Sequence, residues 1–552
     1  MSTSLVSTER DRTTQRNRWW ILGVLCLSVL LVVVDNTIVN VALPTISRDL
    51  NASTTDLQWV VDAYTLAFAG LLLLGGNLGD RLGRRRLLQV GLALFAVTSL
   101  GAAVAHSSGQ LIAARAAMGL AAALIYPATL AILNNVFTNP RERAMAIGIW
   151  SGVSGLAVAI GPVSGGLLLA HFAWGSVFYV NVPVVIIALV AGRLLLPESR
   201  DPNAGRFDPL GALLSAAGIS LLTWSIIEAP RHGWGSATTL GGIAGALAIL
   251  AVFGRHQARR PDPMLDVRLF RNPRFTAASA SIALAFFGLF GFIFLITQYF
   301  QAVRGYAPLR AGVATLPFAI VTGALSPVAI VLMKRFGTKL VVASGLLLMA
   351  AGFVVAATTP EYAAYWGHIV TAMALMAAGL ALTASPATDA IMGALPPDKA
   401  GAGSAVNDTT REVGGTLGVA IVGSVLSSAY GSHVASSLSR LGAPHAAVDA
   451  ARQSIEAGLA VSTRFPGALS PAAGEATRQA FMTGLHAGSL VAAGATAAAA
   501  LLALAFLPSR PGHPAGMTEP SALAGPAGTA QPVSTAQPVS TAQLAEAAQN
   551  LR

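Results

Sequence analysis

Long apolar runs separated by short polar connections are the dominant pattern of this sequence. A helix needs about 20 consecutive apolar residues to cross the ~30 Å hydrocarbon core of a bilayer, and these runs are long enough to do so. The pattern therefore predicts an all-helical integral membrane protein. We expect fourteen transmembrane helices, at residues 19–43, 57–79, 87–106, 109–137, 144–170, 174–196, 209–229, 237–254, 275–301, 309–333, 339–358, 362–393, 402–428 and 481–507.

The positive charges predict how these helices are oriented. Placing the N-terminus inside puts all of the basic clusters on one side of the membrane. These clusters are Arg81/Arg84/Arg85/Arg86, Arg141/Arg143, Arg255/Arg259/Arg260 and Lys334/Arg335/Lys339. The opposite connections carry only scattered arginines. Because basic connections stay in the cytoplasm, we expect a multi-pass protein of the cytoplasmic membrane with both termini cytoplasmic.

The first apolar run is predicted to remain in the protein. The polar segment 1–18 carries several arginines, as the start of a signal peptide does. However, the run at 19–43 is too long for the apolar part of a signal peptide, and no small-residue cleavage site follows it. We therefore treat residues 1–18 as a cytoplasmic tail and 19–43 as a retained helix.

The composition excludes several other functions. Hydrophobic residues make up 54% of the 552 residues and charged residues only 11%, which argues against a set of soluble domains. The net charge of +11 lies in short connections between apolar runs, so nucleic-acid binding is not expected. The single cysteine, Cys26, rules out an intrachain disulfide and a cysteine-based metal site. We expect no metal, no cofactor and no enzymatic activity.

The lysines bear on the energy source. An ATP-driven pump needs a phosphate-binding loop in which a lysine follows a glycine. Lys334, Lys339 and Lys399 are preceded by methionine, threonine and aspartate. We therefore expect no ATP binding by this chain, so that transport would depend on an ion gradient or on a partner subunit.

Two similar halves are visible in the sequence. Arg81-Leu82-Gly83 follows the second predicted helix, and Arg335-Phe336-Gly337 follows the tenth, 254 residues later. A glycine-rich helix follows Arg143-Ala144 and another follows Lys399-Ala400. Parallel repeats of six helices are a known transporter design. The predicted parts are a six-helix bundle at 19–200, two inserted helices at 201–260, a second six-helix bundle at 261–507 with an external loop at 429–480, and a tail at 508–552.

Two segments lie outside the predicted bundles. The external loop at 429–480 is expected to contain a short helix near 446–457. The tail at 508–552 contains the sequence TAQPVS twice in tandem, followed by TAQL. Such low-complexity composition predicts disorder.

Three ionisable residues lie inside the first predicted bundle. Asp35 is in the first helix, Asp62 in the second, with Gln58 and Thr65 on the same face, and Arg115 in the fourth. At 1.5 Å per residue they share one level in the outer half of the membrane. Charges at this depth are costly and mark functional sites, so these three residues are candidates for proton coupling. The alternatives are a static buried ion pair and, for Asp62, a snorkelling or capping role.

The second bundle contains two further polar patterns. Asp408, Arg411 and Glu412 are close enough in one helix to neutralise one another, which is the default interpretation. Aromatic and amide side chains lie on one face of the ninth helix. This pattern is as consistent with the lining of a drug cavity as with packing in the core. The candidate substrate pathway consists of Asp62, Tyr126, Phe290, Phe294 and Gln298.

Residues with small side chains or none form a stripe along one face of the fifth helix. Gly152, Gly155, Ala159, Pro162 and Gly166 recur at helical spacing, and Gly161 and Gly165 flank the proline. Such a stripe lets another helix approach closely. From spacing alone, a structural crossing is favoured over a seal between bundles.

The connection after the second helix reads GNLGDRLGRRR. Its aspartate and arginines can join two helix ends through charge pairs and helix dipoles. The alternative is an ordinary basic inner loop, which would not need the aspartate and both glycines. The candidate switch residues are Gly76, Asp80, Arg81, Gly83, Arg84 and Arg85.

These motifs together resemble the major facilitator superfamily, and within it the 14-helix drug:proton antiporters. The loop after the second helix resembles the signature of the superfamily. GPVSGG at 161–166, with Gly152 nine residues earlier, resembles the antiporter signature. DNTIVNVALP from Asp35, the two inserted helices and FYVNVP at 178–183 resemble the 14-helix subfamily.

The resemblance implies roles for several residues. It implies that Asp35 and Arg115 take part in proton coupling, that the loop controls the switch between inward and outward states, and that Asp62 acts on cationic drugs. The chain departs from the family where Met118 replaces a usual glutamine, and where Trp174-Gly175-Ser176 lacks a usual arginine. The first departure weakens a water-mediated network around Arg115.

We therefore expect a proton-coupled antiporter that exports amphipathic drugs or antibiotics through the lipid bilayer by alternating access. One alternative is a transporter of an endogenous lipid or metabolite on the same fold. Another is a membrane sensor or scaffold that does not transport. The sequence predicts neither the substrate nor the oligomeric state.

Overall fold

The computed structural model describes residues 2–200, 208–261, 263–393, 400–467 and 469–507, and within these ranges the regular structure is helical. The predicted tail at 508–552 lies outside the described residues. Thirteen helical segments are long and apolar enough to cross a membrane. The fourteenth is α2, which bends by 52° between Thr54–Leu72 and Leu74–Leu82. The prediction of an all-helical fold with fourteen spans is thus confirmed.

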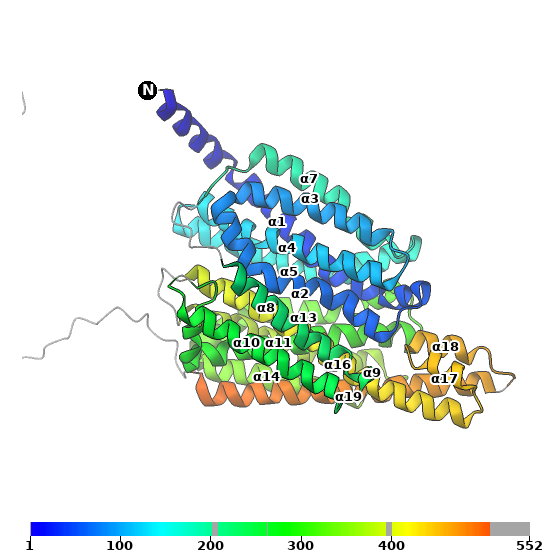
Figure 1. Cartoon of the computed structure of the whole chain (residues 1–552). Helices are drawn as coiled ribbons and strands as arrows, with labels where there is room; N and C mark the ends of the chain where they lie inside the picture. Colours follow the sequence, from blue (N-terminus) through cyan, green and yellow to red (C-terminus); the bar gives the residue numbers. More distant parts are fainter. Residues whose placement is uncertain (1, 201–207, 262, 394–399, 468, 508–552) are drawn as a thin grey trace, which may run out of the picture. The chain divides into compact units, whose positions relative to one another are not determined.

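The first half of the chain forms the N-terminal bundle (Figure 1). Its helices are α1 (Ser2–Leu50), α2 (Thr54–Leu82), α3 (Arg84–Ala103), α4 (Ser108–Val136), α5 (Pro140–His171), α6 (Ser176–Tyr179) and α7 (Asn181–Leu195). We call the end at which α1 ends and α2 begins the outer end, and the end that carries the α2–α3 connection the inner end. A capping box between Ser53 and Asp56 begins α2 at the outer end.

The inserted segment forms a helical pair beside the two bundles. It consists of α8 (Pro209–Ile227), α9 (Ala229–His232) and α10 (Ala237–Arg259). Asp208 begins α8 by accepting a hydrogen bond from the Gly211 amide, and its carboxylate also binds the side chains of Gln257 and Arg260. Because Gln257 and Arg260 lie at the end of α10, this cluster holds the two inserted helices together at the inner end.

The second half forms the C-terminal bundle (Figure 1). Its elements are η1 (Val267–Arg271), α11 (Pro273–Gln298), the π-helix η2 (Tyr299–Val303), α12 (Pro308–Val313), α13 (Leu316–Phe336), α14 (Thr338–Ala357), the π-helix η3 (Tyr365–Ile369), α15 (Val370–Gly393), α16 (Ala400–Arg440), α17 (His445–Ala451), α18 (Ile455–Ser462) and α19 (Leu469–Phe506). The segment expected to be an external loop is largely helical, because α16 continues to Arg440 and α19 begins at Leu469. The short helix expected near 446–457 is instead the pair α17 and α18.

The two halves share one backbone feature that the repeat in the sequence suggested. Gly83 joins α2 to α3 with a φ of 112°, and Gly337 joins α13 to α14 with a φ of 85°. Both conformations favour glycine because a side chain would be strained there. The repeated Arg-x-Gly sequences therefore mark equivalent tight junctions in the two bundles.

Candidate functional site

A buried ion pair lies in the middle of the N-terminal bundle. Nη1 of Arg115 on α4 donates to Oδ2 of Asp35 on α1 over 2.5 Å, and both side chains are fully buried. The Arg115 Nε also donates to the carbonyl of Val60 on α2 over 3.0 Å. The guanidinium carbon stands 4.2 Å from the centre of the Tyr64 ring. The pair therefore ties together α1, α2 and α4.

Asn181 completes the environment of Asp35 from the other side. Its side-chain amide donates to Oδ1 of Asp35 over 2.8 Å and to the hydroxyl of Ser99 over 3.0 Å. The Ser99 hydroxyl in turn donates to the Phe178 carbonyl. Asn181 was part of the family resemblance but was not predicted as a site residue. A polar residue inside an apolar run is the signal that points to it.

Close packing of α4 against α2 holds Arg115 in place. A Cβ atom added to Gly119, one turn after Arg115, would lie 2.9 Å from the carbonyl carbon of Tyr64. Any larger residue would hold the two helices apart. The small residue therefore brings the Arg115 side chain within hydrogen-bonding distance of the α2 backbone. Met118 is buried beside this turn and adds no polar group to it.

Asp62 lies at the seam between the two bundles and not in the Asp35–Arg115 pair. Its side chain is fully buried, and neither carboxylate oxygen has a hydrogen-bond partner among the described residues. On the same face of α2, the Gln58 amide donates to the Ala420 carbonyl over 3.0 Å. The hydroxyl of Thr416 likewise donates to that of Thr65 over 3.0 Å. These contacts place Asp62 on the α2 face that packs against α16.

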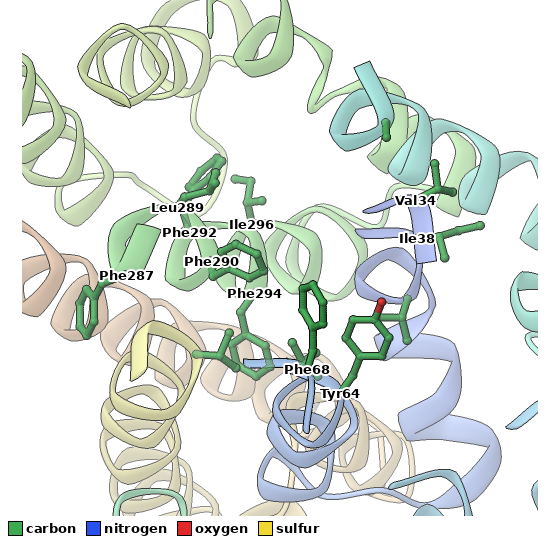
Figure 2. Packing of buried hydrophobic residues seen from close by; sticks show 14 of the residues in the cluster. Val34, Ile38, Tyr64, Phe68, Phe287, Leu289, Phe290, Phe292, Phe294 and Ile296 are labelled. Carbon is green, nitrogen blue, oxygen red and sulfur yellow. The ribbon is translucent and has the colours of Figure 1, made fainter. Parts of the chain in front are cut away.

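Aromatic side chains from both bundles belong to the buried cluster around the seam (Figure 2). The Phe68 ring stands 5.8 Å from that of Tyr126. Phe290 and Phe294 on α11 are buried in the same cluster. The Gln298 amide donates to the carbonyl of Phe294 and is therefore satisfied within its own helix. Figure 2 shows the Phe287 ring pointing away from the other labelled rings.

The small-residue stripe of α5 is packed only along its outer half. A Cβ added to Gly165 would lie 2.8 Å from the Ile38 side chain on α1, and a Cβ added to Gly161 would lie closer still to the Thr37 hydroxyl. A Cβ added to Gly166 would lie 2.6 Å from the Cα of Leu309 on α12.

The inner half of the stripe has no such neighbours. A Cβ added to Gly152 or Gly155 would have no atom of the described residues within 4 Å. Pro162 lies at the boundary between the packed and the open half of the stripe. Its backbone carbonyl still lies against Gly312 of α12. In this state the two bundles are therefore in contact beside the outer half of α5 and apart beside its inner half.

The α2–α3 connection is built around ion pairs within the N-terminal bundle. Nη2 of Arg84 stands 2.8 Å from Oδ1 of Asp80, and the Arg84 amide donates to the carbonyl of Ser199. The Arg85 guanidinium donates to the Leu196 carbonyl after the end of α7. Arg81 is exposed, and Gly76 is half-buried. The predicted charge pairing joins the ends of α2 and α3, and the hydrogen bonds to the carbonyls of Leu196 and Ser199 attach the segment after α7 to them.

The comparison with known families decides the class of this fold. The Major Facilitator Superfamily model matches residues 25–419. The chain belongs to this superfamily. The solved structures that are similar support the fold. A bacterial homologue of the human lysosomal transporter Spinster, in an inward-facing conformation, has a TM-score of 0.60 at 19% identity and covers 89% of this chain and 98% of its own. The inward-open xylose transporter XylE of E. coli has a TM-score of 0.55 at 14% identity, covering 89% of this chain and 97% of its own.

Several curated members of the Major Facilitator Superfamily are similar over most of the chain. The multidrug efflux pump LfrA of Mycolicibacterium smegmatis is 38% identical, covering 89% of this chain and 97% of its own. The methyl viologen resistance protein SmvA of Salmonella typhimurium is 37% identical, covering 86% and 95%. The multidrug resistance protein Stp of Mycobacterium tuberculosis is 34% identical, covering 72% and 74%.

The contacts of Arg411 differ from those that the sequence predicted. Arg411 on α16 donates to the hydroxyl of Thr388 on α15 over 3.0 Å, and it stands 5.2 Å from the Phe286 ring. Among the described side chains it forms no close ion pair with Asp408 or Glu412. The spacing of the three residues favours neutralisation by direct contact. The structure does not show such contact among the described residues. The partners on α15 and α11 could not be read from the sequence of α16.

Proposed function

We propose that this protein is a proton-coupled antiporter that exports amphipathic, mainly cationic drugs or antibiotics across the cytoplasmic membrane by alternating access. The observation that carries the proposal is the buried Asp35–Arg115 pair in a chain whose similar relatives are named for multidrug efflux and drug resistance. Both termini are proposed to be cytoplasmic, as the positive-inside rule predicts. Protons and the drug are the exchanged species, and the chain itself binds neither ATP nor nucleic acid.

Asp35 is proposed to carry the coupled proton. A charge buried at this depth is stable only while it is paired and hydrogen-bonded. Its two partners lie on different helices, Arg115 on α4 and Asn181 on α7. A movement that separates α1 from α4 removes the cation, and the carboxylate is then neutralised by a proton. Restoring the pair releases that proton, so helix movement and proton transfer are linked.

Asp62 is proposed to select cationic substrates. In the state described here it is enclosed between α2 and α16, and no described residue is a hydrogen-bond partner of its carboxylate. When the seam opens, this acid becomes part of the cavity wall, together with Tyr126 on α4 and Phe290 on α11. An acid flanked by aromatic rings suits an amphipathic cation, because the rings attract the cation and bury its apolar surface. Phe294 and Gln298 extend the proposed pathway along α11.

The α5 stripe and the α2–α3 connection are proposed to control the switch between states. Closing the inner side brings the inner half of the stripe, with Gly152 and Gly155, against a neighbouring helix. Opening the outer side separates Gly166 from Leu309. The Asp80–Arg84 pair keeps α2 and α3 rigid during this movement, so that the N-terminal bundle moves as one body.

The test is transport by purified protein in proteoliposomes under an imposed pH gradient, with ethidium as the probe. Asp35→Asn is expected to abolish transport driven by the pH gradient and to retain exchange of dye down its own gradient. Asp49→Asn, which changes an exposed acid near the outer end of the same helix, is the matched control and keeps both activities. Uphill transport at the normal rate by Asp35→Asn would exclude Asp35 as the coupling residue.

A further inference from the structure

The helices α17 and α18 form a small outer cap that is built on the C-terminal bundle. The hydroxyl of Tyr430 on α16 donates to the carbonyls of Ala451 and Ser454 over 2.8 and 2.9 Å. Gly458 on α18 packs so closely that an added Cβ would lie 2.7 Å from the Thr477 side chain on α19. The cap therefore moves with α16 and α19.

The same cap is bonded to the N-terminal bundle. The amide of Thr54, at the start of α2, donates to the carbonyl of Gln453 over 2.8 Å. The hydroxyl of Ser47 on α1 stands 3.2 Å from that of Ser454, within hydrogen-bonding distance. Ser47 and Ser454 are both buried in this contact. Any opening of the outer side that separates the two bundles must break these bonds.

A buried acid lies directly beside this contact. Glu456 is at the second position of α18 and is only 7% exposed. Neither of its carboxylate oxygens has a hydrogen-bond partner among the described residues. The charged or titratable groups that act on it are Arg48 from α1 and Tyr430 from α16.

The remaining charged groups near the cap do not neutralise Glu456. The Arg48 guanidinium makes its own hydrogen bonds to the carbonyl of Pro44 and the hydroxyl of Thr45. On α17, Asp449 is exposed, and so is Arg452 just after that helix. On α19, Arg478 is paired with Glu361 and Glu475. The carboxyl group of Glu456 is thus buried at the contact without a direct ion pair to any described residue.

We propose that α18 is a proton-sensitive latch, which closes the outer side most tightly when Glu456 carries a proton and is released when Glu456 ionises. The inference rests on the alternating movement proposed above, because only a separation of the bundles exposes Glu456. It adds a proton site that lies outside the membrane-spanning helices. When the outer side opens, Glu456 exchanges its proton with the external solution, whereas Asp35 lies inside the membrane-spanning helices.

The pH range of the latch follows from the environment of Glu456. Burial raises its pKa from 4.5 to about 7 in the docked cap, although the nearby hydroxyls of Ser454 and Ser47 and the charge of Arg48 oppose the change. Below pH 4.5 the acid is protonated whether the cap is docked or free, so docking is strongest. Between pH 4.5 and 7 docking takes up a proton and weakens about tenfold per pH unit, or about 300-fold in total. Above pH 7 no further change is expected.

The test measures the distance between the cap and α1 in the full-length protein in lipid nanodiscs. Spin labels are attached at Asp49→Cys and Ala446→Cys, which are exposed positions on α1 and α17, in a Cys26→Ser background. From pH 4.5 to 8 we expect the short-distance population to decline and a longer one to grow. Glu456→Gln should keep the short distance at every pH, because a neutral amide of the same shape has no proton to lose.

Two further variants separate the latch from other titrations. Asp449→Asn, an exposed acid on the same cap, should leave the pH profile of the wild type unchanged. Asp35→Asn should retain a pH-dependent change of this distance that Glu456→Gln lacks, and this result distinguishes failure of the latch from failure of the proposed proton coupling. A wild-type distance that does not change with pH, or an unchanged profile in Glu456→Gln, would overturn the proposal. A short distance at pH 5 in Glu456→Gln verifies that the variant folds and docks.

Discussion

Adding one methyl group at different depths of α5 should have different effects on the conformational equilibrium. In Gly166→Ala the new Cβ would lie 2.6 Å from the Cα of Leu309 and 2.7 Å from the carbonyl oxygen of Pro308. Both are backbone atoms, so α5 and α12 must move apart. In Gly155→Ala the new Cβ would have no atom within 4 Å. The same substitution therefore destabilises the closed outer side in one variant and leaves it unchanged in the other.

The size of the effect can be estimated from overpacking. Inserting a methyl group into a packed contact costs about 1–3 kcal/mol. If only the outer-closed state has this cost, the ratio of outer-open to outer-closed molecules rises by about 5- to 150-fold. Gly155→Ala is expected to leave this ratio unchanged or to lower it, because Gly155 has neighbours only when the inner side closes.

The assay is labelling of a cysteine that the closed seam hides. Thr416→Cys in a Cys26→Ser background places a thiol against Thr65, where the native side chain is fully buried. A membrane-impermeant maleimide added to right-side-out vesicles should label it 5- to 150-fold faster in Gly166→Ala than in the parent. Equal labelling rates in Gly166→Ala and Gly155→Ala, at normal abundance of both proteins, would refute the argument that the outer half of the stripe holds this state closed.

Three further predictions follow from single contacts. Asp62→Ala should reduce resistance to the dication methyl viologen more than to neutral compounds in growth-inhibition assays, and equal losses would show that Asp62 is structural. Gly83→Ala should lower the melting temperature in detergent, because its φ of 112° and the nearby Glu198 carboxylate disfavour a side chain at a cost of about 1–2 kcal/mol. Asn181→Leu should leave one oxygen of Asp35 without its donor, costing about 1–3 kcal/mol, and a melting temperature equal to that of the wild type would contradict the contact.

The number of spans, the repeat and the shared depth of Asp35 and Arg115 could be predicted from the sequence. Apolar runs of membrane-spanning length are a local property, and lipid imposes the helical form on them. The glycines at 83 and 337 repeat because each allows a positive φ at an equivalent junction. Asp35 and Arg115 could be brought to the same depth by counting helical rise, and burial of two opposite charges at one depth favours pairing.

Only the tertiary structure decided which face of each helix meets which neighbour. Lipid-facing and buried faces are both apolar in a membrane, so hydrophobic periodicity gives little information about helix rotation. For this reason the α5 stripe was predicted as one surface, whereas its outer half packs and its inner half is open. Asp62 was grouped with Arg115 by depth, but the rotation of α2 turns it toward α16. The contact of Glu456 with α1 likewise joins segments about 400 residues apart, which no local pattern encodes.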